Sequence, residues 1–216
     1  MKPYRFQSSI VCFVAIGFAS LLAGCSPTAT GHATPESVYA ASQEAIKAQD
    51  YGKLADCFTA EAQHQTAGGF VMNVAMLKKF AKLAAMQGPA AVKKAEEKLG
   101  PMLEVLTKHG VGDEKLTELV KGVGIAGIGN SREANERAGA LIDDKRGFIS
   151  DVSAAYAKIT AAEGQPPAAS FTGELKDLQV DGDTATGAMF NGNARQKNEP
   201  ITFKKVEGKG WLIDVN

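Results

Sequence analysis

Two hydrophobic periods follow one another along the chain. Between residues 35 and 163, apolar side chains return every three or four positions, which is typical of amphipathic helices. From residue 171 to the end, apolar and polar residues alternate, which is typical of strands with one buried face. Helices first and strands last predict an α+β fold, with residues 35–216 forming one domain.

Local signals place the first helices. Thr34 is a typical N-cap residue and Pro35 suits the first helical position, so a helix is predicted to begin there. A short second helix is predicted around Leu54 and Cys57. Thr59 is expected to cap a third helical segment.

Residues 70–163 are predicted to be largely helical, with glycine and proline as breaks. A long helix is expected to begin only after Gly68-Gly69, and Gly100-Pro101 is expected to divide another helix in two. Gly122 to Gly129 form a glycine-rich loop that fits Gly-x-Gly-x-x-Gly. Since no strand precedes this loop, a dinucleotide site is not expected there. The charged run 143–146 is expected to cap the last helix and face water.

The alternating part predicts two hairpins. Asp181-Gly182 is a typical tight-turn pair, and residues 207–210 provide a second turn. Together the hairpins predict a four-stranded antiparallel meander over residues 171–216. The expected strands are 171–180, 183–191, 200–206 and 211–215.

The first 25 residues follow a charged, apolar and then small-residue pattern. Lys2 and Arg5 precede an apolar run from Ile10 to Ala23, which has the length of a signal-peptide core and is short for a bilayer span. The run ends in Leu22-Ala23-Gly24-Cys25, which resembles the lipobox of bacterial lipoproteins. The resemblance implies cleavage between Gly24 and Cys25, loss of residues 1–24, and lipid on Cys25. The alternative is an ordinary signal peptide that is cut elsewhere, for example after Ala33.

Lipid on Cys25 would determine the cellular location of the protein. Residues 25–34 are small and polar and are predicted to form a flexible tether. Two or more acyl chains, as lipoproteins of this class carry, anchor a protein stably. Ser26 is not the aspartate that retains many lipoproteins at the inner membrane. An outer-membrane location facing the periplasm is therefore expected, in a bacterium that has such a membrane.

Charge and cysteine content exclude several functions. The 24 Lys and Arg residues equal the 24 Asp and Glu residues in number and alternate with them, so nucleic acid is not an expected partner. After processing and lipidation, Cys57 is the one remaining thiol, and its apolar neighbours predict a buried, inert side chain.

No cofactor or metal is expected. His32, His64 and His109 are far apart in sequence, and none has a second ligand at metal-binding spacing. Asp181-Gly182-Asp183 lacks the further oxygen ligands of a calcium loop, so it is interpreted as a turn.

Both ends of the domain carry a familiar pattern of residues: Pro35-Glu36-Ser37-Val38, Ala48-Gln49-Asp50 and Thr59-Ala60-Glu61 at the front, and Val180-Asp181-Gly182-Asp183, Ile201-Thr202-Phe203 and Gly210-Trp211-Leu212-Ile213 at the back. These stretches resemble the nuclear transport factor 2-like superfamily. The resemblance implies a curved sheet around a long helix, with a cone-shaped cavity between them. Residues 70–163 depart from it, since they are predicted helical where the superfamily has strands.

The inward side of the meander can be listed from strand alternation. Leu178, Val180, Ile201, Phe203, Trp211, Ile213 and Val215 are expected to share it. This side has no histidine or carboxylate, because Asp214 falls on the other one. The residues expected to line a cavity, if it is open, are Tyr39, Tyr156, Phe203, Trp211 and Ile213.

The leading hypothesis is therefore a non-catalytic, lipid-anchored envelope module that binds an envelope protein or an apolar small molecule. One rival is an isomerase or dehydratase of the ketosteroid isomerase type, for which Tyr39, Asp56 and Tyr156 are the candidate groups. The other rival is a structural spacer whose meander only closes a core.

Overall fold

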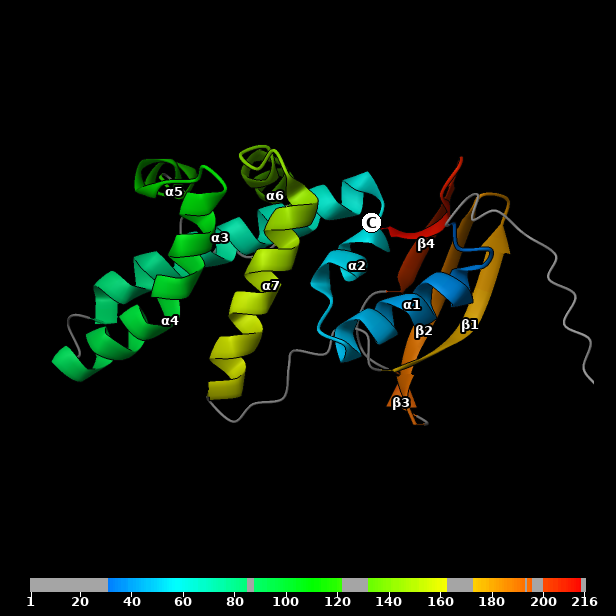
Figure 1. Cartoon of the computed structure of the whole chain (residues 1–216), viewed down its shortest axis with the longest axis horizontal. Coiled ribbons are helices and arrows are strands. Elements are labelled where there is room, and N and C mark those ends of the chain that lie inside the picture. The colour runs from blue at the N-terminus through cyan, green and yellow to red at the C-terminus, as the bar shows by residue number, and fades with distance from the viewer. Residues whose placement is uncertain are drawn as a thin grey trace, which may run out of the picture.

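A computed structural model describes residues 31–84, 88–121, 132–162, 173–192, 194–195 and 200–214. The signal segment, Cys25, the glycine-rich loop 122–129 and Val215 lie outside the described residues. Within the described part, seven helices precede an antiparallel sheet, which confirms the predicted α+β class (Figure 1). The helices are α1 (Pro35–Lys47), α2 (Tyr51–Asp56), α3 (Ala60–Ala84), α4 (Pro89–Lys108), α5 (Asp113–Leu119), α6 (Arg132–Gly139) and α7 (Lys145–Ala162).

The sheet has the strand order β1-β2-β4-β5, with the short β3 paired to β2. Both predicted hairpins are confirmed: Asp181 pairs with Thr184 across the first turn, and Val206 pairs with Gly210 across the second. Gly182 has φ 58°, a left-handed conformation that glycine adopts without strain. The strands are β1 (Glu174–Asp181), β2 (Thr184–Asn191), β3 (Ala194–Arg195), β4 (Ile201–Val206) and β5 (Gly210–Asp214).

The predicted caps are confirmed where the structure describes them. Thr34 Oγ1 accepts a hydrogen bond from Ser37 N at 3.2 Å, and Ser37 Oγ accepts one from Thr34 N at 3.1 Å, which forms a capping box before α1. Thr59 Oγ1 accepts from Ala62 N at 3.0 Å at the start of α3. Each bond satisfies an N–H group that has no partner within its helix.

Two predicted helix breaks are wrong. The third helix runs from Ala60 through Gly68-Gly69 to Ala84 without interruption. Gly68 lies where α3 crosses α6, and a Cβ there would overlap the carbonyl oxygen of Asn135. Gly139 of α6 is in the same position relative to α3, because a Cβ on Gly139 would overlap the carbonyl oxygen of His64. These glycines therefore permit close helix packing rather than ending a helix.

The second wrong break is at Gly100-Pro101, which α4 passes through. Proline removes one hydrogen bond from a helix, and Pro101 is exposed, so its ring projects away from the core. The following turns are held by the buried side chains of Met102 and Leu106, which are 4% and 0% exposed. Tertiary packing thus overrides the local signal.

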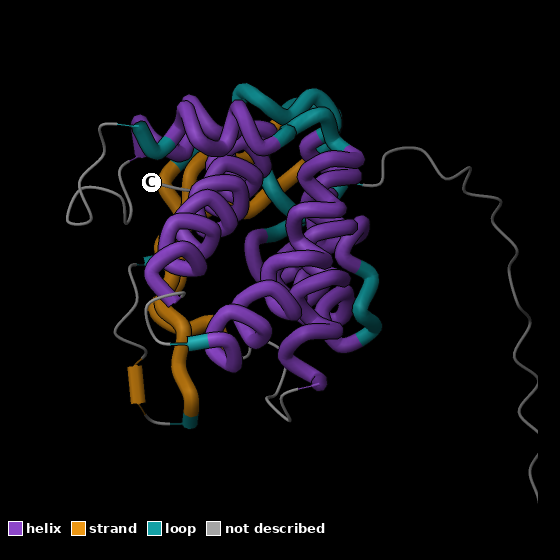
Figure 2. Tube along the Cα trace, turned by 90° about the vertical axis from the view of Figure 1, so that its left-hand side faces the viewer, coloured by secondary structure: helices purple, strands orange, loops and turns teal. Residues whose placement is uncertain are grey.

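The described side chains form two apolar cores. One core lies mainly in a helical unit, which we define as α3 to α7, and also includes Ala55 of α2. The other lies mainly in a sheet unit, which we define as α1, α2 and the strands. Figure 2 looks from the helical unit toward the sheet and shows the strands behind the helices. The third helix joins the two cores, because Ala62 packs in the sheet core and Val71 packs in the helical core.

An ion pair links the two units across the α2–α7 contact. Arg146 Nε and a terminal nitrogen donate to the two carboxylate oxygens of Asp56 at 2.6 and 2.8 Å. The carboxylate raises the pKa of Arg146. Asp144 Oδ1 accepts from Gly147 N at 2.9 Å and so caps α7, as expected of the charged run. Arg146 departs from the expectation that this run simply faces water.

Candidate functional site

Three of the five side chains expected to line a cavity, those of Phe203, Trp211 and Ile213, pack in a core. Phe203, Trp211 and Ile213 are 1%, 6% and 2% exposed, and they belong to one cluster with Val38 of α1 and Phe58. The first helix therefore covers the inner side of the sheet with packed apolar groups. Such packing suits a structural interior more than a catalytic chamber.

The predicted inward side of β1 needs one correction. Val180 is 57% exposed, although its pairing with Ala185 places it on the inner side. The register of β1 against β2 shifts between Lys176 and Gln179, and Asp177 has φ 54° at this irregularity. As a result both Leu175 and Leu178 pack against the sheet core, although strict alternation would separate them.

The three candidate groups of an isomerase are not brought together. The Tyr39 hydroxyl donates to the carbonyl oxygen of Gly173 at 2.7 Å, and burial raises the pKa of Tyr39. Asp56 binds Arg146 at the unit boundary. Tyr156 is 41% exposed on α7, in the helical unit. Tyr39 and Asp56 thus each bind a structural group of the chain.

Two distant segments cover the outer edge of β5, which the sequence did not indicate. Trp211 N donates to His32 O at 2.8 Å. Farther along the strand, Ile213 N donates to Cys57 O at 2.8 Å, and Thr59 N donates to Ile213 O at 2.9 Å. These bonds use groups that an edge strand would otherwise offer to another chain. His32, which was expected within a flexible tether, is therefore part of the fold.

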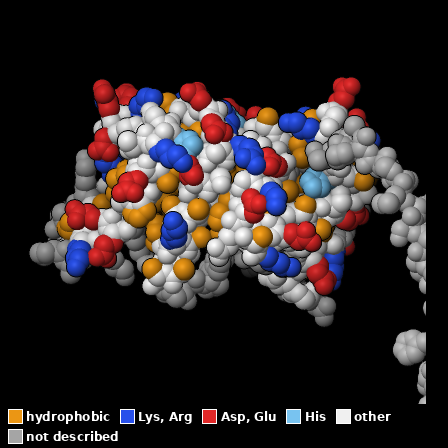
Figure 3. Space-filling model, in the orientation of Figure 1, with side chains coloured by type: hydrophobic (Ala, Val, Ile, Leu, Met, Phe, Trp, Pro, Cys, Tyr) orange, Lys and Arg blue, Asp and Glu red, His pale blue; other side chains and the backbone are white. Residues whose placement is uncertain are grey.

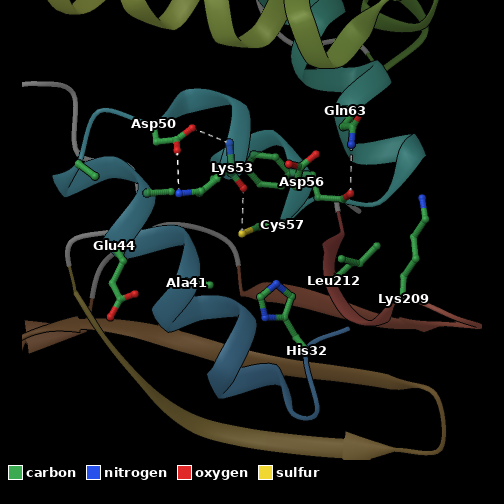
Figure 4. Close-up of a pocket in the computed structure, with 13 residues that line it drawn as sticks. His32, Ala41, Glu44, Asp50, Lys53, Asp56, Cys57, Gln63, Lys209 and Leu212 are labelled. Atoms are coloured by element: carbon green, nitrogen blue, oxygen red, sulfur yellow. Dashed lines mark hydrogen bonds and ion pairs between the residues drawn. The ribbon is translucent and has the colours of Figure 1, made fainter. Parts of the chain in front are cut away.

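An open groove of about 750 Å³ lies beside this edge, between α1, α2 and β5 (Figure 4). Its walls carry both acidic and basic side chains. Several of them bind other groups of the same chain. Asp50 pairs with Lys53 at 3.1 Å, and hydrogen bonds from Lys53 lower the pKa of Asp50. Gln63 Nε2 donates to Ala55 O at 2.9 Å. The groove is lined by His32, Ala41, Glu44, Ala45, Ala48, Asp50, Lys53, Asp56, Cys57, Phe58, Gln63, Lys209 and Leu212.

The Cys57 thiol, which lies at the groove, is expected to have low reactivity. Its Sγ donates to Lys53 O at 3.4 Å, and 3% of the residue is exposed. Burial, followed by the charge of Asp56, raises the pKa of the Cys57 thiol to about 11. Since thiolate is the reactive form, this environment suppresses both alkylation and oxidation.

A thiol assay is expected to show this protection. Cys57 of the folded protein should react with a maleimide dye at pH 8 at least tenfold more slowly than a free thiol, and should react fully in urea. The measurement is dye incorporation followed by intact mass, with Lys209→Cys as an exposed positive control. Rapid labelling of Cys57 in the folded protein would contradict the buried placement.

The histidines occupy separate places. His32 lies in the groove, and His64 Nε2 is 2.9 Å from Glu136 O where α3 meets α6. His109 Nε2 is 2.8 Å from Asp151 Oδ2, where hydrogen bonds from Lys108 and His109 lower the pKa of Asp151. Among the described residues, no group of three His, Cys, Asp or Glu side chains is arranged to hold a metal ion.

None of the described helices combines the length and apolar character needed to cross a bilayer. Comparison of the chain with known protein families, characterised proteins and solved structures finds no match in any of the three.

Proposed function

We propose that this chain is a bacterial lipoprotein that is held at a membrane by lipid on Cys25 and acts by binding a partner, without catalysis. The observation that carries the proposal is Leu22-Ala23-Gly24-Cys25 at the end of a signal-peptide core. The proposed location is the outer membrane, on its periplasmic side. Lipid on the new N-terminal residue makes the anchor independent of any membrane-spanning helix.

The attachment of His32 to β5 supports an anchoring role. Six residues lie between Cys25 and His32, so the seven residue steps from one to the other span at most about 25 Å. The backbone bond from Trp211 N to His32 O fixes the end of that chain to the sheet. Because this tether is short and its end is bonded to β5, the folded domain is held close to the bilayer.

Binding is favoured over catalysis by the packing of the sheet core and by the structural partners of Tyr39 and Asp56. A protein partner is favoured by exposed apolar groups on the helical unit. Leu77 and Tyr156 are 47% and 41% exposed, and apolar side chains gather over this unit on the face shown in Figure 3. Charges of both signs are interspersed on the same face.

A kinship with the nuclear transport factor 2-like superfamily is part of the proposal for the sheet unit only. It is supported by the sequence likeness at both ends and by the packing of α1 across an antiparallel sheet. The helical unit lies between the two stretches of likeness, as a large addition to that plan.

Replacing Cys25 with serine tests the anchor. Cys25→Ser is expected to lose the acyl mass and to move from the membrane pellet to the soluble fraction, or to remain as uncleaved precursor, because serine offers no thiol for lipid transfer. Cys57→Ser, which alters a buried thiol, is the matched control and should fractionate like the parent protein. The proposal fails if Cys25→Ser is processed and pelleted as the parent is.

A further inference from the structure

The point where the chain enters the fold determines which part of the molecule lies near the bilayer, given the lipid anchor proposed above. His32 pairs with Gly210 in a parallel bridge, so Gly31, which precedes His32, lies toward the β4–β5 turn. Gly31 sits directly against that turn, since a Cβ there would be 2.7 Å from the carbonyl group of Lys209. The tether therefore leaves the fold beside residues 207–210.

The β1–β2 turn lies beside the same exit. Lys205 N donates to Asp183 O at 2.8 Å, and Thr184 pairs with Lys204 across the strands. We define the exit corner as these two adjacent turns together with the end of β4, residues 181–184 and 204–210. It belongs to the sheet unit.

The helical unit extends away from this corner. The first bond of the α3 region, from Thr59 N to Ile213 O, fixes the start of α3 to β5. The third helix then continues for 25 residues, which corresponds to about 37 Å at 1.5 Å per residue. Figure 1 shows the sheet and the C-terminal end of α3 at opposite ends of the long axis.

The two lengths exclude one orientation. If the protein stood on its α3–α4 end, the sheet would be about 37 Å above the bilayer, whereas the chain from Cys25 to His32 reaches at most about 25 Å. We infer that the exit corner is a membrane-facing surface that meets lipid headgroups, while the α3–α4 end of the helical unit is held away from them.

The charges of the exit corner indicate the kind of lipid surface it fits. The corner has three exposed lysines and three exposed acidic residues, so its net charge is zero. It is therefore not attracted to an anionic bilayer by net charge. Zwitterionic headgroups match this balance, and the tether rather than electrostatic attraction sets the orientation. The six charged residues are Lys204, Lys205 and Lys209, and Asp181, Asp183 and Glu207.

Two dye positions test the inference on the full lipidated protein in phosphatidylcholine vesicles. Lys209→Cys places a dye on the exit corner, and Lys93→Cys places one near the start of α4. A quencher on lipid headgroups should quench the dye at position 209 at least threefold more than the dye at position 93. The difference should persist in 0.5 M salt and with added phosphatidylglycerol, because the corner has no net charge. The parent protein, with Cys57 buried, sets the labelling background.

Lengthening the tether provides the second arm. Ten Gly and Ser residues inserted after Thr30 raise its maximum reach to about 60 Å, which should bring the quenching ratio toward one. Equal or reversed quenching with the native tether, or a ratio unchanged by the insertion, would overturn the membrane-facing assignment. If the purified protein instead lacks acyl mass, the lipid anchor itself has failed, which is a separate result.

Discussion

Gly68→Ala is expected to destabilise the fold strongly, although alanine is the better helix former. The new Cβ would overlap the carbonyl oxygen of Asn135, which is a backbone atom and cannot rotate out of the way. Overpacking of this kind costs about 1–3 kcal/mol, and a fixed backbone obstacle places Gly68 at the upper end. Relieving the overlap requires α6 to move away from α3, which would also open the contact at Gly139.

The neighbouring position provides a matched control. At Gly69 a Cβ would meet only Asn135 Nδ2, at an ordinary 3.8 Å. Gly69→Ala should therefore stabilise α3 by about 0.5–1 kcal/mol, the usual gain of alanine over glycine inside a helix. Urea unfolding of the purified mature variants measures both free energies. Equal effects at the two positions would contradict the crossing geometry of α3 and α6.

These two glycines also show why part of the fold could not be predicted. A Gly-Gly pair is a local sign of a break, and the sequence does not reveal that Asn135, 67 positions after Gly68, occupies the space of a side chain. Where signal and partner are close in sequence, prediction succeeded, as with the Thr34 cap and the Asp181-Gly182 turn. Each of those features is decided by residues within one turn.

The site shows the same division on a larger scale. Alternation correctly placed Phe203 and Ile213 in the interior, because the strand period determines the face. The sequence did not predict the hydrogen bonds of β5 to His32 and Cys57. These bonds join backbone groups, so they do not affect the pattern of apolar and polar side chains. The pair of Asp56 with Arg146 was missed for a related reason: 90 residues separate the partners, and many other charges could have paired.

Phe148→Ala is expected to cost the most, about 3–5 kcal/mol, because it removes a large, fully buried side chain and leaves a cavity. Phe148 is 0% exposed in the helical core. It also meets the ring of His109 edge to face, with ring centres 5.3 Å apart. Phe203→Ala, in the sheet core, is its counterpart and should cost a similar amount, since Phe203 is 1% exposed.

The pair of variants tests whether the two cores unfold together. Trp211 is the single tryptophan and reports the sheet core, whereas far-UV circular dichroism reports mainly the helical unit. The unbroken α3 packs in both cores, so Phe148→Ala should shift the Trp211 fluorescence transition as far as the dichroism transition. A Trp211 transition that stays in place while the dichroism transition moves would mean that the units unfold separately. The third helix would then be a hinge between two independent bodies. In that case α3 would not act as a rigid spacer of about 37 Å, and the α3–α4 end could approach the bilayer.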